Sequence, residues 1–256
     1  VFGKIGEYKL MQNFEQLQLL IEQELAKINY PNSPKKLYQP IEYVLALGGK
    51  RMRPILVLMA HQLFNDDLIK AIFPALAIEV FHNFTLLHDD IMDNAHLRRG
   101  KKTVHEKWNN NVAILSGDTM LVQTYQLMCN ADKDVLKEVL NVFSKAATEV
   151  CEGQQWDMDF ETQSDVSLSD YMKMIENKTA VLLAASLQIG GITAGASKEN
   201  QNNLYHFGLN MGIAFQLKDD LLDAFGNSET FGKQVGGDIM ANKKTYLYLK
   251  ALVLAN

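Results

Sequence analysis

The sequence contains little cysteine and no extended apolar run. Its 256 residues include only Cys129 and Cys151, which lack CxxC spacing, so neither a disulfide scaffold nor a zinc site is indicated and a reduced, cytoplasmic setting is favoured. The first residues show no apolar segment of the signal-peptide type. The most apolar later segment, residues 179–196, is interrupted by serine, glutamine and glycine, which predicts a buried helix rather than a membrane span.

An excess of positive charge is also missing. The chain has a formal net charge of -5 and a pI of about 5.7. Because nucleic-acid phosphates attract basic surfaces, this balance argues against a general nucleic-acid binder.

Proline is confined to the first part of the chain. All five prolines lie within residues 31–74, and residues 75–256 are rich in good helix formers, which favours helices. Apolar residues recur at spacings of three and four, as from Leu17 to Ile28, and turn-forming segments separate stretches of helix length. No alternating strand pattern, low-complexity tract or linker is present. The sequence therefore predicts one all-α domain over residues 1–256.

Two acidic clusters each follow an apolar segment. Both have the pattern DDxxD, with Asp89, Asp90 and Asp93 in the first and Asp219, Asp220 and Asp223 in the second. In a helix these positions lie within about 100° of one another, so the carboxylates of each cluster share one face and repel. Mg²⁺ prefers oxygen ligands and is commonly held by carboxylates together with substrate phosphates. Two facing helices with such clusters could hold several Mg²⁺ ions and a diphosphate, whereas solvated acidic turns would explain one cluster better than two.

Basic residues accompany the acidic clusters. LGGKRMRP places a Gly-Gly turn before Lys50, Arg51 and Arg53, where glycine permits close backbone approach and arginine can bind phosphate through a bidentate fork. The segment lacks P-loop spacing, and alone it would suit an ordinary basic helix start equally well. The phosphate interpretation is strengthened by the further cations Arg98, Arg99, Lys233, Lys243 and Lys244.

Taken in order, the motifs resemble those of the trans-isoprenyl diphosphate synthases, or polyprenyl synthetases. The similarity runs from about Pro40 to Ala251 and rests on GGKRMRP, HDDIMDNAHLRRG, LSGD, EGQQWD, NKTA, FQLKDDLLD, FGKQVGGD and KKT. It implies a single-domain helical bundle around a deep central cavity, usually a homodimer. It also implies a Mg²⁺-dependent prenyltransferase that condenses isopentenyl diphosphate with a dimethylallyl, geranyl or farnesyl diphosphate.

The resemblance also assigns site residues. The Mg²⁺ ligands would be Asp89, Asp93 and Asp219, with Asp90, Asp220 and Asp223 as ligands or water-mediated supports. The allylic diphosphate would contact Arg98, Lys178, Thr179, Gln216, Lys233 and Lys243. Isopentenyl diphosphate would contact Lys50, Arg53, Arg99 and His82, which precedes Asp89 by two helical turns and shares its face. His88 is expected to be structural.

The chemistry expected of such a site is ionisation followed by alkylation. Mg²⁺ and the cations, with Asp89, Asp93, Asp219 and Lys178 as the catalytic set, would neutralise charge on the departing diphosphate so that the allylic C–O bond ionises. The double bond of isopentenyl diphosphate would attack the carbocation, and the released diphosphate would take the proton. Apolar walls would exclude water, which otherwise hydrolyses the cation.

Two features depart from the family pattern. Asn242 stands where the family usually has glycine before the lysine of KKT. The sequence also stops soon after that motif, so we expect it to lack the C-terminal helices of the family.

Product length in this family depends on bulky residues upstream of the first DDxxD. The fifth position upstream is Phe84, followed by the small Thr85, which predicts a short product of C15 to C20, leaning to C20. On a helix Phe81 lies about 12 Å below Asp89 and could form the floor instead.

Other interpretations remain open at this point. A longer-chain synthase would share these motifs. A terpene cyclase would need Asn, Ser and Glu spaced along a helix, whereas GNSE is contiguous. A di-iron bundle would need a second ExxH besides Glu79 to His82, and a non-catalytic subunit would not require intact DDxxD motifs.

Overall fold

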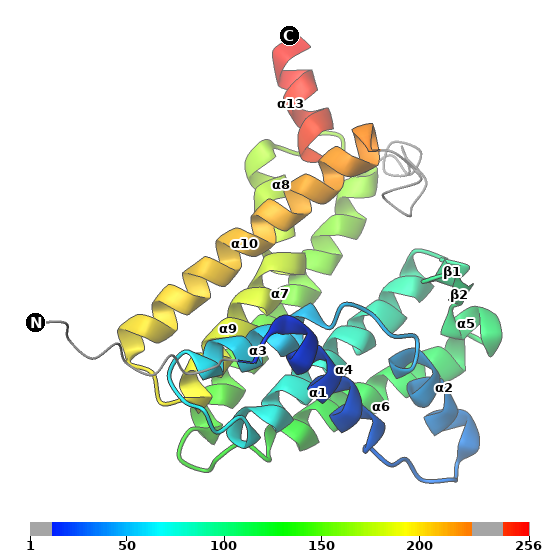
Figure 1. Cartoon of the computed structure of the whole chain (residues 1–256). Coiled ribbons are helices and arrows are strands. Elements are labelled where there is room, and N and C mark those ends of the chain that lie inside the picture. Colours follow the sequence, from blue (N-terminus) through cyan, green and yellow to red (C-terminus); the bar gives the residue numbers. More distant parts are fainter. Residues whose placement is uncertain (1–11, 227–242, 256) are drawn as a thin grey trace, which may run out of the picture. The chain divides into compact units, whose positions relative to one another are not determined.

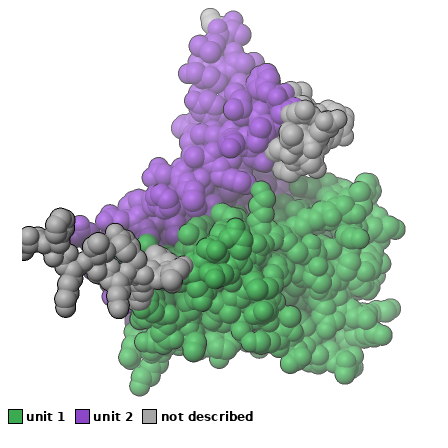
Figure 2. Space-filling view, viewed as in Figure 1, with its two compact units in different colours: residues 1–136 green, residues 137–256 purple. Residues whose placement is uncertain are grey.

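The computed structural model describes residues 12–226 and 243–255. The chain divides into two compact units, residues 1–136 and 137–256, which Figure 2 shows in different colours. Each unit is built almost entirely of helices, so the all-α prediction is confirmed for the described residues.

Unit 1 is organised around one long apolar helix. This helix, α4 (Ile69–Met92), packs against α3 (Met52–Gln62) and α6 (Asn110–Met128), and also contacts the helices α1 (Phe14–Ala26) and α2 (Lys35–Leu45) (Figure 1). Because neighbours cover it on several sides, α4 is apolar around most of its circumference. By length and composition α4 could cross a membrane, but most of its apolar window is buried within the protein, as in a core helix.

The C-terminal end of α4 is closed by a Schellman motif. Asn94 adopts φ 51°, the left-handed region that asparagine tolerates, and donates to the carbonyl of Ile91 at 3.2 Å. Ala95 donates to the carbonyl of Asp90 at 2.9 Å. The helix therefore stops at its acidic cluster and the chain reverses there.

A small hairpin follows, where the sequence predicted only a break. Strands β1 (Leu97–Arg98) and β2 (Lys101–Lys102) pair antiparallel, and the short helix α5 (Val104–Lys107) comes next. The two loop residues, Arg99 at φ 53° and Gly100 at φ 73°, have the positive φ values of a type I′ turn. The sequence did not predict these strands, because two-residue strands are too short to show an alternating pattern.

Unit 2 contains the remaining helices. They are α7 (Leu136–Thr162), α8 (Leu168–Ile175), the π-helix η1 (Glu176–Ala180), α9 (Val181–Thr193), α10 (Lys198–Phe225) and α13 (Tyr246–Ala255). The segment predicted as a buried helix is confirmed as α9, which is buried almost throughout. Helix α10 packs against α9 and η1. A Cβ at Gly208 would lie 2.7 Å from the Cα of Ala184, so the two backbones are in direct contact there.

A similar close contact joins α7 to the π-helix. A Cβ at Gly153 would lie only 2.2 Å from the backbone nitrogen of Lys178. A π-helix has i→i+5 hydrogen bonds and is often found at functional sites. The contact with Gly153 holds the backbone of this segment, which carries Lys178 and Thr179, close to α7.

We therefore expect Gly153→Ala to lower the free energy of unfolding by about 1–3 kcal/mol, because the added methyl group must displace backbone rather than a flexible side chain. Denaturant titration followed by circular dichroism measures this change. Thr148→Ala, at an exposed position of the same helix, should stay within about 0.5 kcal/mol of wild type. Equal effects of the two substitutions would show that the contact is not tight.

Candidate active site

The first acidic cluster lies at the end of α4 and pairs with the hairpin. Asp90 is 3% exposed, and its two carboxylate oxygens accept hydrogen bonds from Nε of Arg98 at 2.9 and 3.0 Å. Asp89 lies 3.9 Å from a terminal nitrogen of the same arginine, and Asp93 is exposed at the helix end. Burial raises the pKa of Asp90, and the hydrogen bonds from Arg98 oppose that shift.

A cationic cluster lies further back along α4. One terminal nitrogen of Arg53, on α3, is 3.1 Å from Nε2 of His82 on α4. Burial and then the charges of Arg53, Arg99 and Arg98 hold the pKa of His82 well below its usual value, so the imidazole is neutral at pH 7. Burial also lowers the pKa of Arg53 to about 10. Nε of Arg53 is buried and has no hydrogen-bond partner among the described residues, so a donor remains for an anion.

Arg99 reaches the same region by crossing the Gly-Gly turn. A Cβ on Gly49 would lie 2.7 Å from its terminal guanidinium nitrogens, and Gly49 adopts φ 140°, so only glycine fits. Lys50 follows directly and is exposed. Three of the residues predicted for isopentenyl diphosphate, namely Arg53, His82 and Arg99, are therefore electrostatically coupled within unit 1.

The second acidic cluster lies on α10, and its middle aspartate is held by neutral donors. Asp220 is 5% exposed, and one of its carboxylate oxygens accepts a hydrogen bond from the hydroxyl of Tyr171. The other accepts from Nε2 of Gln216 at 3.1 Å, and Gln216 in turn accepts from the hydroxyl of Thr179 at 3.2 Å. Burial raises the pKa of Asp220, and these hydrogen bonds oppose the shift. The predicted Thr179, Gln216 and Asp220 thus form one hydrogen-bonded chain within unit 2.

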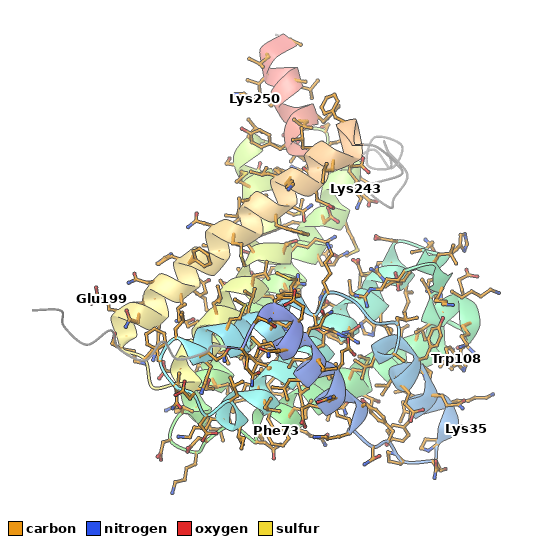
Figure 3. The ribbon with its side chains drawn as sticks, viewed as in Figure 1. Lys35, Phe73, Trp108, Glu199, Lys243 and Lys250 are labelled. Atoms are coloured by element: carbon orange, nitrogen blue, oxygen red, sulfur yellow. The ribbon has the colours of Figure 1, made fainter. Side chains whose placement is uncertain are left out.

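Lys178 and Lys243 converge on one carboxylate. Nζ of Lys178 donates to Asp157 at 2.5 Å, and Nζ of Lys243 lies 4.0 Å from the same oxygen. Lys243, labelled in Figure 3, precedes α13. Asp157 was not among the predicted site residues, although the motif EGQQWD that contains it was noted.

The residues predicted to set product length lie on α4. Phe81 and Phe84 are 1% and 8% exposed, with ring centroids 5.6 Å apart. Thr85 is half-buried and its hydroxyl donates to the carbonyl of His82 at 2.8 Å. His88 contacts the ring of Phe84 and approaches the carbonyl of Ile114 at 3.2 Å, as a structural histidine would.

Some predicted residues cannot be placed. Lys233, Asn242 and the asparagine, serine and glutamate of GNSE lie outside the described residues. Within the described ranges, no three His, Cys, Asp or Glu side chains are grouped closely enough to hold a metal by themselves. Glu79 of the ExxH pattern pairs with Arg51 at 2.6 Å, so the di-iron interpretation does not fit the site.

The family model described as polyprenyl synthetase matches residues 34–256, which includes both acidic clusters and the cationic cluster. The chain belongs to the polyprenyl synthetase family. It is 41% identical over 220 residues to a geranylgeranyl diphosphate synthase of Methanosarcina mazei, covering 85% of this chain and 68% of the relative. It is 40% identical over 238 residues to a geranylfarnesyl diphosphate synthase of Natronomonas pharaonis, covering 85% and 69%.

Solved structures agree with the family assignment. A crystal structure of a geranylgeranyl pyrophosphate synthase superposes with a TM-score of 0.92 at 53% identity, covering 95% of this chain and 74% of that one. The resemblance inferred from the motifs is confirmed, as is the reaction class, because polyprenyl synthetases are prenyltransferases.

The neutral state of His82 predicts a pH effect on stability. The pKa of His82 is lower in the folded chain than the usual 6.5. Above pH 6.5 the imidazole is neutral in both the folded and the unfolded chain, so stability does not depend on it. Below pH 6.5 only the unfolded chain takes up the proton, so the free energy of unfolding decreases as pH falls towards the folded pKa. Wild type should therefore lose more melting temperature than His82→Gln when pH falls from 7.5 to 5. Differential scanning calorimetry of both proteins measures this, and parallel losses would contradict it.

Proposed function

We propose that this polyprenyl synthetase condenses isopentenyl diphosphate with an allylic diphosphate to give a short all-trans prenyl diphosphate of C15 to C20, leaning to C20. The observation that carries the proposal is the similarity over nearly the whole chain to a geranylgeranyl pyrophosphate synthase at 53% identity. The coupled cations of unit 1 support it, since they suit a diphosphate.

The donor chemistry of the acidic clusters fits Mg²⁺, which takes carboxylate oxygens. We propose that Asp89 and Asp93 are Mg²⁺ ligands in unit 1 and, separately, that Asp219 and Asp223 are Mg²⁺ ligands in unit 2, with diphosphate oxygens completing the coordination of each ion. Asp90 and Asp220 are already engaged, the first by Arg98 and the second by Tyr171 and Gln216, which favours a supporting role for both. Bound Mg²⁺ would neutralise charge on the leaving diphosphate.

The side chains of the protein then have separate tasks. The side chains of residues 137–256 proposed to bind the allylic diphosphate, and to offset the negative charge that grows on it as the C–O bond breaks, are Lys178, Thr179, Gln216, Lys233 and Lys243. For residues 1–136, Arg98 is proposed to bind allylic diphosphate as well. Lys50, Arg53, Arg99 and the neutral His82 are proposed to bind isopentenyl diphosphate. The double bond of that substrate attacks the allylic cation, a proton is lost from the adduct, and the released diphosphate is proposed to accept it.

Product length is proposed to depend on α4. Two relatives named for different products are about equally similar to this chain. The geranylgeranyl diphosphate synthase is 41% identical to it and the geranylfarnesyl diphosphate synthase is 40% identical to it. The lean to C20 is therefore supported by the 53% identity to a geranylgeranyl pyrophosphate synthase, by the two buried phenylalanines before the acidic cluster, Phe81 and Phe84, and by the smaller Thr85 beside them.

Two broader proposals accompany the reaction. A homodimer is supported by exposed apolar residues on one face of α6, among them Ile114, Leu115 and Val122, which are 45%, 59% and 58% exposed. A cytoplasmic location is supported by the free thiols of Cys129 and Cys151.

The reaction is tested with purified protein, Mg²⁺, isopentenyl diphosphate and each allylic primer, with products identified by mass spectrometry. We expect prenyl diphosphates up to C20, no product with EDTA, and recovery when Mg²⁺ is restored. Asp89→Asn should lower kcat about a hundredfold or more, because charge stabilisation of the leaving group is weakened. The control Asp134→Asn changes an exposed aspartate outside the motifs and should have no effect. Absence of prenyl product with every primer would refute the proposal.

Product length is tested by substitutions on α4. Thr85→Phe should shorten the product towards C15 by adding bulk beside Phe84, and Phe81→Ala should lengthen it by removing a buried ring. Thr148→Phe, which adds the same bulk at an exposed position of α7, should leave the product unchanged. If neither variant of α4 alters the chain length, this helix does not limit elongation.

A further inference from the structure

Two charged residues beside the cationic cluster have no part in the proposed reaction. Arg51 lies between Lys50 and Arg53 in the sequence, yet it is 3% exposed and cannot present its guanidinium to a substrate. Glu79, on α4, is 2% exposed. A buried charge needs a specific partner, so the arrangement of these residues requires an explanation.

Arg51 connects three helices. Its Nη1 donates to Oε1 of Glu79 on α4 at 2.6 Å, and its Nε donates to Oε1 of Glu22 on α1 at 2.8 Å. Its Nη2 donates to the backbone carbonyl of Leu45 at the end of α2 at 2.7 Å. Every nitrogen of the guanidinium is therefore used inside the protein.

These contacts hold a strained backbone. Arg51 has φ 48°, in the left-handed region that residues other than glycine rarely adopt. It follows Gly48 and Gly49, which also have positive φ, and it immediately precedes α3, which carries Arg53. The conformation of residues 48–53 thus depends on where the guanidinium of Arg51 is anchored.

Glu79 is the more completely fixed of the two anchoring carboxylates. Its Oε1 also accepts a hydrogen bond from Nδ2 of Asn83 at 2.8 Å, whereas the side chain of Glu22 is 40% exposed. Glu79 lies three residues before His82 on α4, which places it on the same side of the helix. Its charge favours the protonated forms of Arg53 and Arg99, and so offsets repulsion among the arginines.

We propose that Glu79 is a positioning residue for the isopentenyl diphosphate site. By anchoring Arg51, Glu79 fixes the turn that carries Lys50 and the start of the helix that carries Arg53. It also fixes Gly49, which the guanidinium of Arg99 contacts. Glu79 does not touch the substrate itself. This inference rests on the proposed function, because it assumes that these cations bind isopentenyl diphosphate.

The test is Glu79→Gln, which keeps the shape of the side chain and removes its charge. We expect KM for isopentenyl diphosphate to rise about tenfold, as when one charge-assisted contact is misplaced, with kcat and the allylic KM within about twofold of wild type. The dissociation constant of isopentenyl diphosphate, measured by calorimetry, should rise in parallel. Glu22→Gln, which removes the more exposed carboxylate from the same arginine, should have a smaller effect. Glu138→Gln, which removes a surface pair with Lys198, should have none.

The outcomes separate the inference from the function. Wild type that forms product, with a Glu79→Gln variant whose two KM values are unchanged or rise together, would overturn the positioning role and leave the function intact. Wild type that binds isopentenyl diphosphate but forms no product would overturn the function, while weaker binding by Glu79→Gln would still support the role.

A milder variant covers the case in which Glu79→Gln fails to fold. Asn83→Ala removes one hydrogen bond from the carboxylate of Glu79, and it should raise KM for isopentenyl diphosphate about threefold with the allylic KM unchanged. An unchanged KM in a folded Asn83→Ala variant would count against the proposal.

Discussion

Buried carboxylates have to be paired, and the arrangement of unit 1 depends on which arginine pairs with which carboxylate. Arg98 binds Asp90 and Arg51 binds Glu79, each through charge-assisted hydrogen bonds between buried or half-buried groups. The carboxylates of Glu79 and Asp90 are thus occupied by Arg51 and Arg98, while Nε of the buried Arg53 has no hydrogen-bond partner in the part of the chain that the structure describes. The surplus of positive charge on this side of α4 is what an anionic substrate can neutralise.

The two DDxxD clusters use different chemistry for the same purpose. In each, the middle aspartate is buried and has a raised pKa, and in each it is fully engaged by neighbouring donors. Asp90 is held by an arginine, whereas Asp220 is held by the neutral Tyr171 and Gln216. One aspartate of each cluster therefore anchors its helix region locally. In the first cluster, the charge of Arg98 beside Asp89 and Asp90 also offsets the repulsion among the three carboxylates.

Much of the fold and of the candidate site could be predicted from the sequence. The helices follow from apolar spacing and from the absence of proline after residue 74, and the family follows from ordered motifs. The hairpin at Leu97–Lys102 could not be predicted, because its strands are too short to leave a pattern. Asp157 was also missed, since only the fold brings it to Lys178 and Lys243.

The sequence by itself determined the helical class, the family and the set of charged residues, because these depend on local spacing and on motif order. Only the tertiary structure decided how those charges are used. GGKRMRP presents three cations in four positions, and nothing in its letters separates Arg51 from Arg53. The two arginines differ because α4 places Glu79 beside Arg51 and His82 beside Arg53. Since buried charged groups need specific partners, these neighbours determine the role of each arginine.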